Sequence, residues 1–346
     1  MNEQIDIQNT KIGVVGAGSW GTALAKLLAD KGFKLDLWAY EQEVKEQIDQ
    51  TRINQVFLPN AVLPDNLTAS NDIQTVVSDK DMILVVVPSH CMRDVSLQMQ
   101  PFVSDSSIVV SASKGIENKT HLTMTGILSE TLPRVSQDQF CVLSGPSFAK
   151  EVAEQVPTVV AVASTSAKNA AWVQHIFACP TFRVYVNDDP VGTQVGGAVK
   201  NVIAVAAGIC DGMDMGLNPR AALITRGLTE MNRLGIRMGA DPLTFQGLAG
   251  VGDLFLTCTG ALSRNYTLGI QIGQGKKLEE IISEMRMVAE GVKTTRSVYN
   301  LSRKLGVDLP ICHEVYHVLF DGLPVQETIE RLMNRSLKHE LDGITC

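Results

Sequence analysis

The feature that most constrains the fold of this chain is a set of three closely spaced glycines near its start. Gly16, Gly18 and Gly21 are spaced as G-x-G-x-x-G. The three glycines directly follow a predicted strand at residues 11–15 and open a helical pattern over residues 19–31. In that context the first glycine permits a tight strand-to-helix turn, the second lets a pyrophosphate approach the backbone, and the third lets helix and strand pack closely. The run therefore predicts a Rossmann-type dinucleotide site, with the pyrophosphate at the helix N-terminus.

The end of the second predicted strand, residues 35–39, bears on which dinucleotide is bound. A carboxylate there ordinarily hydrogen-bonds the adenosine ribose of NAD. In this chain Asp36 lies inside the strand, and Tyr40 and Glu41 follow its end. Without a carboxylate at the strand end a 2′-phosphate is not repelled, although Glu41 lies only one position further on. The cofactor is therefore predicted to be NAD or NADP, and the choice between them stays open.

The length of 346 residues exceeds the roughly 250–300 residues that one core usually serves, so two domains are expected. Up to residue 190, β-rich runs alternate with helical stretches, as in a parallel sheet covered on both faces. Further strands are predicted at residues 82–87, 108–112 and 140–143, followed by a hairpin-like pair at 158–163 and 182–186. Beyond them, helical periodicity prevails at residues 191–209, 221–234, 278–285, 294–305, 311–320 and 325–333. We predict an α/β fold, with a doubly wound Rossmann domain over residues 1–190 and an all-α domain over residues 191–346.

Charge and composition exclude several classes of function. Lys plus Arg number 30 against 37 Asp plus Glu, a formal net charge of −7, which is the wrong sign for a general nucleic-acid binder. No purely apolar run is longer than residues 82–87, which is far shorter than the roughly 20 residues of a membrane-spanning helix. Residues 1–10 lack the parts of a signal peptide, and seven cysteines without a Cys-x-x-Cys pair indicate reduced thiols. We expect a cytoplasmic protein that neither binds nucleic acid nor inserts into a membrane.

Several polar residues lie where catalytic groups are expected. Ligands of open α/β sheets bind beyond the carboxyl ends of the strands, and Ser89, Lys114 and Ser147 follow such ends. Lys200 is the only charged residue in the apolar helical stretch 191–209. A lysine removed from water has a lowered pKa and can donate a proton, so Lys200 is predicted to be functional rather than a lysine whose amine reaches solvent at a domain edge.

A second group of polar residues follows Gly260 in a predicted loop. Ser263, Arg264 and Asn265 are adjacent there, and the planar guanidinium of arginine matches phosphate oxygens. Together with the two lysines, Arg264 would form a local positive cluster in an acidic protein and select a small anion. By itself this segment also fits an ordinary surface arginine.

One string points to a different chemistry. HEVYH at residues 313–317 matches the H-E-x-x-H pattern of zinc proteases, with both histidines on one helical face. Catalytic zinc needs a third protein ligand, but the nearby Glu327, Glu330 and His339 have no spacing that supports one. We therefore predict no metal site and treat His313 and His317 as parts of a packed helix.

Longer motifs occur in both halves of the chain. The first half contains GAGSWGTALA at residues 16–25, SKGIE at 113–117 and SGPSFAKEV at 144–152. The second half contains VKNVIAVAAGICDGMDMGLN at 199–218, AALITRGL at 221–228, GLAGVGDLFLTCTGALSRN at 247–265 and MVAEGVKT at 287–294. In this order the motifs resemble those of the bacterial NAD(P)-dependent glycerol-3-phosphate dehydrogenases, over about residues 11–333. The resemblance implies a Rossmann domain, a helical domain and a homodimer.

The resemblance also implies roles for individual residues. Lys200 matches the family's catalytic proton donor or acceptor, with Lys114 and Asp253 as the other catalytic positions. Substrate contacts are implied at Lys114, Gly145, Ser147, Lys200, Asp253, Ser263, Arg264 and Asn265. Cofactor contacts are implied at Gly16, Gly18, Ser19, Trp20, Gly21, Tyr40, Lys114, Ala149, Arg264, Val288 and Glu290, with the family variable at Tyr40.

The implied activity is reversible NAD(P)-dependent interconversion of dihydroxyacetone phosphate and sn-glycerol 3-phosphate, the backbone precursor of glycerophospholipids. A protonated Lys200 would give its proton to the carbonyl oxygen while Asp253 keeps it charged. This requires the Lys200 amine to face the nicotinamide. A related two-domain β-hydroxy acid dehydrogenase and a non-catalytic dinucleotide-sensing module are the alternatives.

Overall fold

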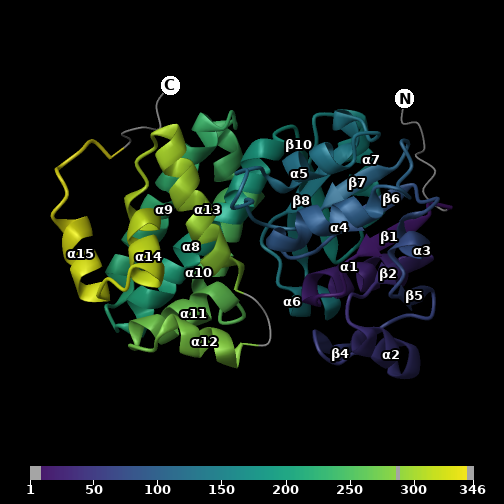
Figure 1. Ribbon diagram of the computed structural model, residues 1–346, viewed down its shortest axis with the longest axis horizontal. Coiled ribbons are helices and arrows are strands. Elements are labelled where there is room, and N and C mark those ends of the chain that lie inside the picture. The colour runs from purple at the N-terminus through teal and green to yellow at the C-terminus, as the bar shows by residue number, and fades with distance from the viewer. Residues whose placement is uncertain (1–8, 286–288, 341–346) are drawn as a thin grey trace. The chain divides into compact units, whose positions relative to one another are not determined.

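The computed structural model describes residues 9–285 and 289–340, and the chain divides into two compact units (Figure 1). One unit comprises Met1–Ser113 and Met124–Pro190, and the other comprises Lys114–Thr123 and Val191–Cys346. The first holds the strands, and the regular elements of the second, over its described residues, are helices. The predicted α/β fold with a helical C-terminal part is therefore confirmed. A short segment from the middle of the sequence groups with the helical unit.

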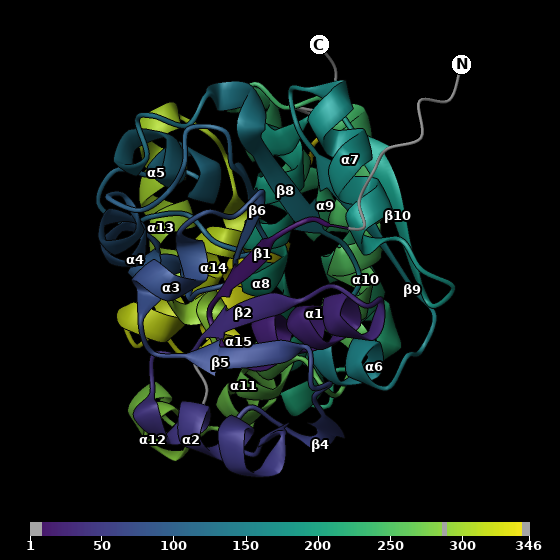
Figure 2. The ribbon, with the colours of Figure 1, turned by 90° about the vertical axis from the view of Figure 1, so that its right-hand side faces the viewer.

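An eight-stranded sheet forms the centre of the first unit (Figure 2). Its strands are β1 (Ile12–Val15), β2 (Leu35–Trp38), β5 (Leu67–Ser70), β6 (Met82–Val85), β7 (Ile108–Ser111), β8 (Phe140–Ser144), β9 (Thr158–Ala163) and β10 (Phe182–Asn187). The order across the sheet is β10-β9-β8-β7-β6-β1-β2-β5. From β5 to β8 the strands are parallel and follow the arrangement of a dinucleotide-binding sheet.

Helices cover both faces of this sheet. In Figure 2, α1 (Ser19–Asp30) and α7 (Ala167–Phe177) lie on one side, and α3 (Ile73–Val77), α4 (Met92–Met99) and α5 (Met124–Thr131) lie on the other. Strands covered on both faces read as continuous apolar runs, and all four residues of β6 are buried. The remaining elements of the unit are α2 (Gln42–Thr51), α6 (Ala149–Ala153) and the two-stranded β3 (Ile53–Asn54) and β4 (Leu58–Val62).

The prediction of a hairpin-like pair at the end of the sheet is wrong. β9 and β10 run parallel, with Thr158 opposite Phe182 and Ala163 opposite Asn187. Parallel neighbours need a crossover connection, and α7 provides it between the two strands. β9 pairs antiparallel with β8 instead. The apolar pattern of each strand was sufficient to locate it in the sequence. The relative direction of the two strands depends on the helix that connects them.

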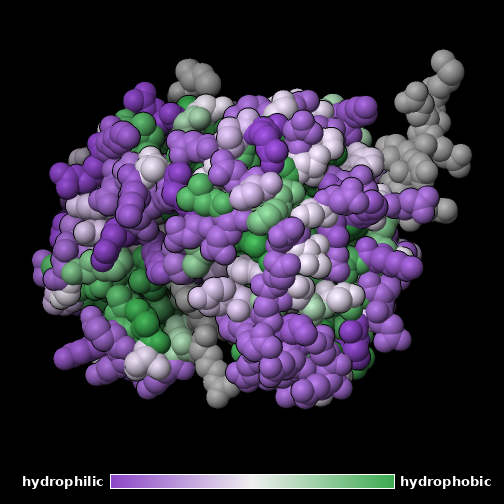
Figure 3. Space-filling model, turned by 45° about the vertical axis from the view of Figure 1, so that its right-hand side comes forward, coloured by the Kyte–Doolittle hydropathy of each residue, from purple (hydrophilic) through white to green (hydrophobic). Residues whose placement is uncertain are grey.

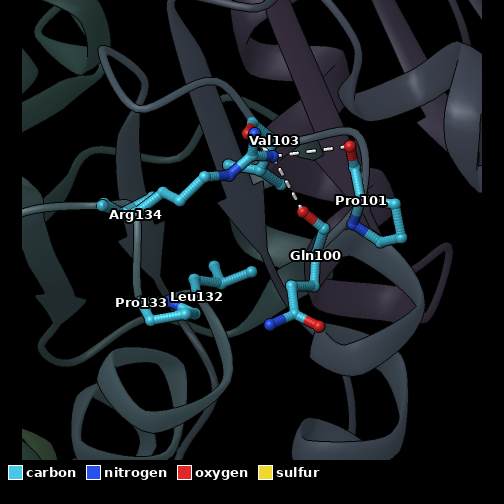
Figure 4. Close-up of a pocket in the computed structure, with 7 residues that line it drawn as sticks. Gln100, Pro101, Val103, Leu132, Pro133 and Arg134 are labelled. Carbon is cyan, nitrogen blue, oxygen red and sulfur yellow. Dashed lines mark hydrogen bonds between the residues drawn. The ribbon is translucent and has the colours of Figure 1, made fainter.

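The chain that follows α4 is held by one arginine (Figure 4). The Arg134 guanidinium donates to the carbonyl oxygens of Gln100, Pro101 and Val103 at 3.2, 3.4 and 3.0 Å. A small pocket beside it is lined also by Leu132 and Pro133. Carbonyls just beyond a helix end need donors, so Arg134 has a structural role in this unit.

The helical unit is built around α8 (Pro190–Gly212), which is buried from Gly192 to Cys210. Around it lie α9 (Leu217–Arg237), α10 (Asp253–Thr259), α11 (Arg264–Gly273), α12 (Leu278–Glu284), α13 (Glu290–Leu305), α14 (Pro310–Phe320) and α15 (Val325–Met333). By length and composition α8 could cross a membrane, but 89% of its most apolar window is buried inside the protein. It is a core helix, as its small residues predict. The surface in Figure 3 is mostly hydrophilic, with scattered hydrophobic areas.

Glycines bring α8 and α11 into backbone contact. A Cβ atom at Gly208 would lie 2.0 Å from the carbonyl oxygen of Tyr266, and one at Gly269 would lie 2.2 Å from that of Val205. Real Cβ atoms do not approach backbone oxygens so closely, so a side chain at either position would force the helices apart. This contact places the N-terminus of α11 beside the middle of α8.

The variant Gly208→Ala tests this contact. Helix propensity alone favours alanine by about 1 kcal/mol, but the added methyl group has no space against α11. We expect the free energy of unfolding to fall by roughly 1–3 kcal/mol, as for other overpacked cores. Urea unfolding followed by circular dichroism measures the change.

Gly18→Ala is the matched control, since no described atom lies within 4 Å of a Cβ at Gly18. Its free energy of unfolding should stay within about 0.5 kcal/mol of the wild-type value. Equal effects of the two substitutions would contradict the close helix contact.

Candidate active site

The glycine turn has two glycines that the fold requires and one that it does not. Gly16 has a φ of +116°, and a Cβ there would lie 2.5 Å from the carbonyl oxygen of Val86. A Cβ at Gly21 would lie 1.8 Å from the carbonyl oxygen of Gly16. At Gly18 the neighbouring space is open among the described residues. The turn therefore has room for a ligand at the middle glycine.

The helix that follows suits an anionic ligand. Gly18 is the N-cap of α1 and, as a glycine, has no side chain to cap the helix, and the described first turn contains no acidic residue. A helix N-terminus of this kind favours a negative group. Ser19 donates its hydroxyl to the carbonyl oxygen of Phe57 at 2.7 Å, and Trp20 packs against the core of the unit.

Other predicted residues of the sheet unit follow the carboxyl ends of β2 and β8. Tyr40 lies just beyond β2 with 78% of its surface exposed. Gly145 follows β8 with a φ of +150°, and Ser147 donates to the Gly145 carbonyl oxygen at 3.0 Å. Ala149 begins α6. Because β1, β2 and β8 share one direction, these residues and the glycine turn lie at the same edge of the sheet.

In the helical unit, one carboxylate joins two lysines. Lys200 Nζ donates to Asp253 Oδ1 at 2.5 Å, and Lys114 Nζ donates to Asp253 Oδ2 at 2.6 Å. Lys200 Nζ also donates to Thr257 Oγ1 at 2.8 Å, and Thr257 donates to the Asp253 carbonyl oxygen at 2.6 Å. Asp253 is 1% and Lys200 is 7% exposed. The catalytic positions implied by the motifs therefore form one cluster, in which Asp253 and Lys200 are buried and Lys114 is part-buried.

Burial and charge act in opposite directions on these groups. Burial lowers the pKa of Lys200 to about 8, although the Asp253 carboxylate raises it in part and the Lys114 ammonium lowers it further. Burial by itself would raise the pKa of Asp253, but the charges of Lys114 and Lys200 outweigh it and hold that pKa below its usual value. Asp253 is thus an anion, and Lys200 is mostly protonated at neutral pH but releases its proton readily.

Local chain geometry explains how three distant residues meet. A Cβ at Gly196 would lie 2.3 Å from the carbonyl oxygen of Ala249, so the segment before α10 lies directly against α8. Gly196 and Lys200 are four residues apart and share one helix face, which brings Asp253, the first residue of α10, to the lysine. Lys114 begins the segment Lys114–Thr123, and this segment is anchored to the helical unit because Ile116 is buried in the helical core.

The segment expected to be a loop around residue 264 is a helix N-terminus. Ser263 caps α11, and its hydroxyl accepts from the Tyr266 amide at 3.3 Å. The prediction of a loop is wrong because the serine N-cap lies directly before a ten-residue helix. Arg264 is exposed at the first position of α11 and is electrostatically attracted to Glu290. Arg264 thus occupies the positive end of a helix dipole.

Asn265 connects three helices. Its amide nitrogen donates to Asn201 Oδ1 at 2.9 Å, and its amide oxygen accepts from the Gly291 amide at 2.9 Å. Asn201 belongs to α8 and Gly291 to α13, so part of the Asn265 amide is used within the protein. Val288, which the motifs associate with the cofactor, lies outside the described residues.

The two histidines of the HEVYH string have other partners. His313 Nε2 is 2.7 Å from Ser302 Oγ, and His317 Nδ1 is 2.6 Å from Asp321 Oδ2. Glu314 pairs with Arg331 at 3.4 Å. Over residues 9–285 and 289–340, no group of three or more His, Cys, Asp or Glu side chains could hold a metal ion. The string is part of the packed helix α14.

Comparison with known families decides which family these residues represent. The family model described as NAD-dependent glycerol-3-phosphate dehydrogenase N-terminus matches residues 11–170, and the one described as the C-terminus matches residues 189–330. The chain belongs to this family.

Relatives within the glycerol-3-phosphate dehydrogenase family match nearly the whole chain. The protein of Syntrophobacter fumaroxidans, named glycerol-3-phosphate dehydrogenase, NAD(P)+, is 54% identical over 331 residues, covering 96% of this chain and 97% of its own. The protein of the same name from Geobacter metallireducens is 54% identical over 95% of this chain and 98% of its own. The crystal structure of glycerol-3-phosphate dehydrogenase from Coxiella burnetii is 38% identical, with a TM-score of 0.91, covering 94% of this chain and 99% of that one.

Sequence reasoning missed one member of the lysine cluster. Thr257 contacts both Lys200 and Asp253, and it lies four residues after Asp253 on the same face of α10. Predicting a helix that begins at Asp253 would have placed Thr257 on the same helix face. The glycine-rich stretch before Asp253 has no helical pattern, so that helix was not predicted.

The variant Asp253→Asn tests how strongly the cluster depends on its carboxylate. The substitution keeps the shape but removes the carboxylate charge that pairs with the buried Lys200 and the part-buried Lys114. We expect the free energy of unfolding to fall by roughly 3 kcal/mol, because breaking a buried ion pair leaves uncompensated charge. Urea unfolding at neutral pH gives the value.

Asp49→Asn provides the matched comparison. Lys45 and Asp49 are also 2.6 Å apart, but Asp49 is 42% exposed. In this variant the free energy of unfolding should fall by less than about 1 kcal/mol. Similar losses in both variants would show that burial of the cluster is energetically unimportant.

Proposed function

We propose that this chain catalyses the reversible NAD(P)-dependent interconversion of dihydroxyacetone phosphate and sn-glycerol 3-phosphate. The observation that carries the proposal is the buried Lys200, paired with Asp253 at 2.5 Å and having a pKa lowered to about 8, in a member of the glycerol-3-phosphate dehydrogenase family. A general acid works best when its pKa lies near the working pH. Lys200 meets that requirement.

In the reducing direction, Lys200 is the proton donor. A bound nicotinamide dinucleotide would supply the hydride that carbon 2 of the substrate receives. As negative charge develops on the carbonyl oxygen, Lys200 Nζ gives it a proton, and Lys114 adds electrostatic stabilisation. The ketone gains one hydride and one proton and becomes the alcohol, while Lys200 is left neutral and takes its next proton from solvent. Asp253 holds both lysines in place throughout.

The dinucleotide fits the glycine turn of the first unit. The open space at Gly18 and the N-terminus of α1, which has no acidic residue in its described first turn, suit a pyrophosphate. We assign the cofactor-binding role to Gly16, Gly18, Ser19, Trp20, Gly21, Tyr40, Lys114, Ala149, Arg264, Val288 and Glu290. The cofactor is NAD or NADP.

The substrate phosphate is assigned to the N-terminus of α11. Arg264 supplies a planar guanidinium at the positive end of the helix, and Ser263 and Asn265 flank it. Gly145 and Ser147 complete the proposed substrate contacts, together with Lys114, Lys200 and Asp253. Binding energy from the phosphate then positions the carbonyl carbon for reaction.

Three further features belong to the proposal. The chain acts as a homodimer, it supplies the glycerophospholipid backbone, and it works in the cytoplasm, where its six described cysteines remain free thiols.

Initial rates with NADH and with NADPH on dihydroxyacetone phosphate test the activity and the cofactor choice together. Dihydroxyacetone without its phosphate should react poorly; comparable rates would favour a different β-hydroxy substrate.

The variant Lys200→Ala tests the proton donor. We expect kcat to fall by about 10²-fold or more, as in the loss of other general acids, with little change in the dissociation constant for NADH. Lys276→Ala, at an exposed lysine of the same unit, should keep the wild-type kcat. Near-normal turnover of Lys200→Ala would refute the assignment.

The pH dependence provides a separate test. The protonated amine is the acid, so initial rates of ketone reduction should fall as the pH rises through about 8. Alcohol oxidation needs the neutral amine and should rise over the same range. In the Lys200→Ala variant, neither the rate of ketone reduction nor the rate of alcohol oxidation should change with pH in this way. A wild-type profile that is flat from about pH 7 to about pH 9 would contradict the role of Lys200.

A further inference from the structure

The β3–β4 hairpin is attached to the glycine turn by one buried asparagine. Asn54 is fully buried, and its Nδ2 donates to the Ala17 carbonyl oxygen at 2.8 Å and to Thr22 Oγ1 at 2.9 Å. Its Oδ1 accepts from the Phe57 amide at 3.0 Å. Both amide protons and the amide oxygen of this side chain are therefore used.

The contact controls the direction of one peptide group. Ala17 precedes Gly18, and its carbonyl oxygen also accepts from Thr22 Oγ1 at 3.1 Å. The carbonyl and the amide of a trans peptide point in opposite directions. Because the Ala17 carbonyl is held inward by Asn54 and Thr22, the Gly18 amide is directed outward. Gly18 is also the position whose neighbouring space is open.

A second contact ties the hairpin to the same turn. Ser19 donates its hydroxyl to the Phe57 carbonyl oxygen at 2.7 Å. Leu58 and Ala61 of β4 pack with Ala23 of α1 in a small apolar cluster. The hairpin is therefore fixed to α1 by packing, and Asn54 is the polar link between the hairpin and the backbone of the turn.

We propose that Asn54 is a positioning residue for the dinucleotide, which orients the Gly18 amide toward the pyrophosphate from a hairpin outside the glycine motif. This inference rests on the proposed function for the identity of the ligand. It assigns Asn54 to the binding of the dinucleotide and gives it no part in proton transfer at Lys200.

The variant Asn54→Ala tests the proposal, with NADH as the probe. We expect the dissociation constant for NADH, measured by fluorescence, and the KM for NADH to rise by roughly tenfold, the effect of losing a preorganised hydrogen-bond donor. At saturating NADH the kcat should remain within about twofold of wild type, because the lysine cluster is unchanged.

Asn66→Ala is the matched control. Asn66 Nδ2 also donates to two carbonyl oxygens, of Ala29 and Phe33, both at 2.8 Å, but at the opposite end of α1. This variant should lose stability in urea while its affinity for NADH stays at the wild-type value. Equal weakening of NADH binding in the two folded variants would overturn the proposal, since it would reflect general destabilisation.

Two further outcomes are decisive. If Asn54→Ala does not fold, Asn54→Leu keeps a side chain of similar size but removes the donor to the Ala17 carbonyl oxygen, and it should weaken NADH binding in a folded protein; unchanged binding there overturns the inference. If the wild-type protein binds NADH and Asn54→Ala binds it equally well, the inference alone fails. If the wild-type protein binds neither NADH nor NADPH, the proposed function fails and the inference fails with it.

Discussion

One carboxylate shared by two lysines is the interaction on which the helical unit depends. Asp253 pairs with both Lys114 and Lys200, so two positive charges share one carboxylate in the cluster. Removing charged groups from water is costly. An anion carrying the opposite charge would offset it. The electrostatics of the cluster thus favour a negatively charged substrate, in a protein whose net charge of −7 would repel one elsewhere.

Close helix packing fixes the positions of the residues in this cluster. Glycines along α8 let neighbouring backbone approach at two levels: Gly196 admits the segment before Asp253, and Gly208 admits α11. A rigid, buried helix then carries Lys200 between these two contacts. Positions held by backbone packing vary less than positions held by long side chains, so the same helix sets both the proposed proton donor and the proposed phosphate-binding helix end.

The sequence was most informative where a residue type has few physical uses. Glycine spacing located the turn after β1, and a lone lysine among apolar residues pointed to Lys200. It was least informative where the outcome depends on distant partners. The direction of β10 follows from the crossover through α7, and the contact of Asn54 with Ala17 joins residues 37 positions apart, with no local pattern to mark it. Thr257 was missed for a simpler reason, because the helix that carries it was not recognised.

The segment Lys114–Thr123 has a consequence for how the protein is made. It lies between β7 and α5 in sequence, yet it belongs to the helical unit, whose main part follows residue 190. During synthesis on the ribosome, domains fold as they emerge, so the strands can assemble while this segment still lacks the helices that bury Ile116. Its lysine meets Asp253 only after translation has passed residue 253. The lysine cluster is therefore completed late, and a nascent chain arrested before that point would present an apolar side chain for chaperones to protect.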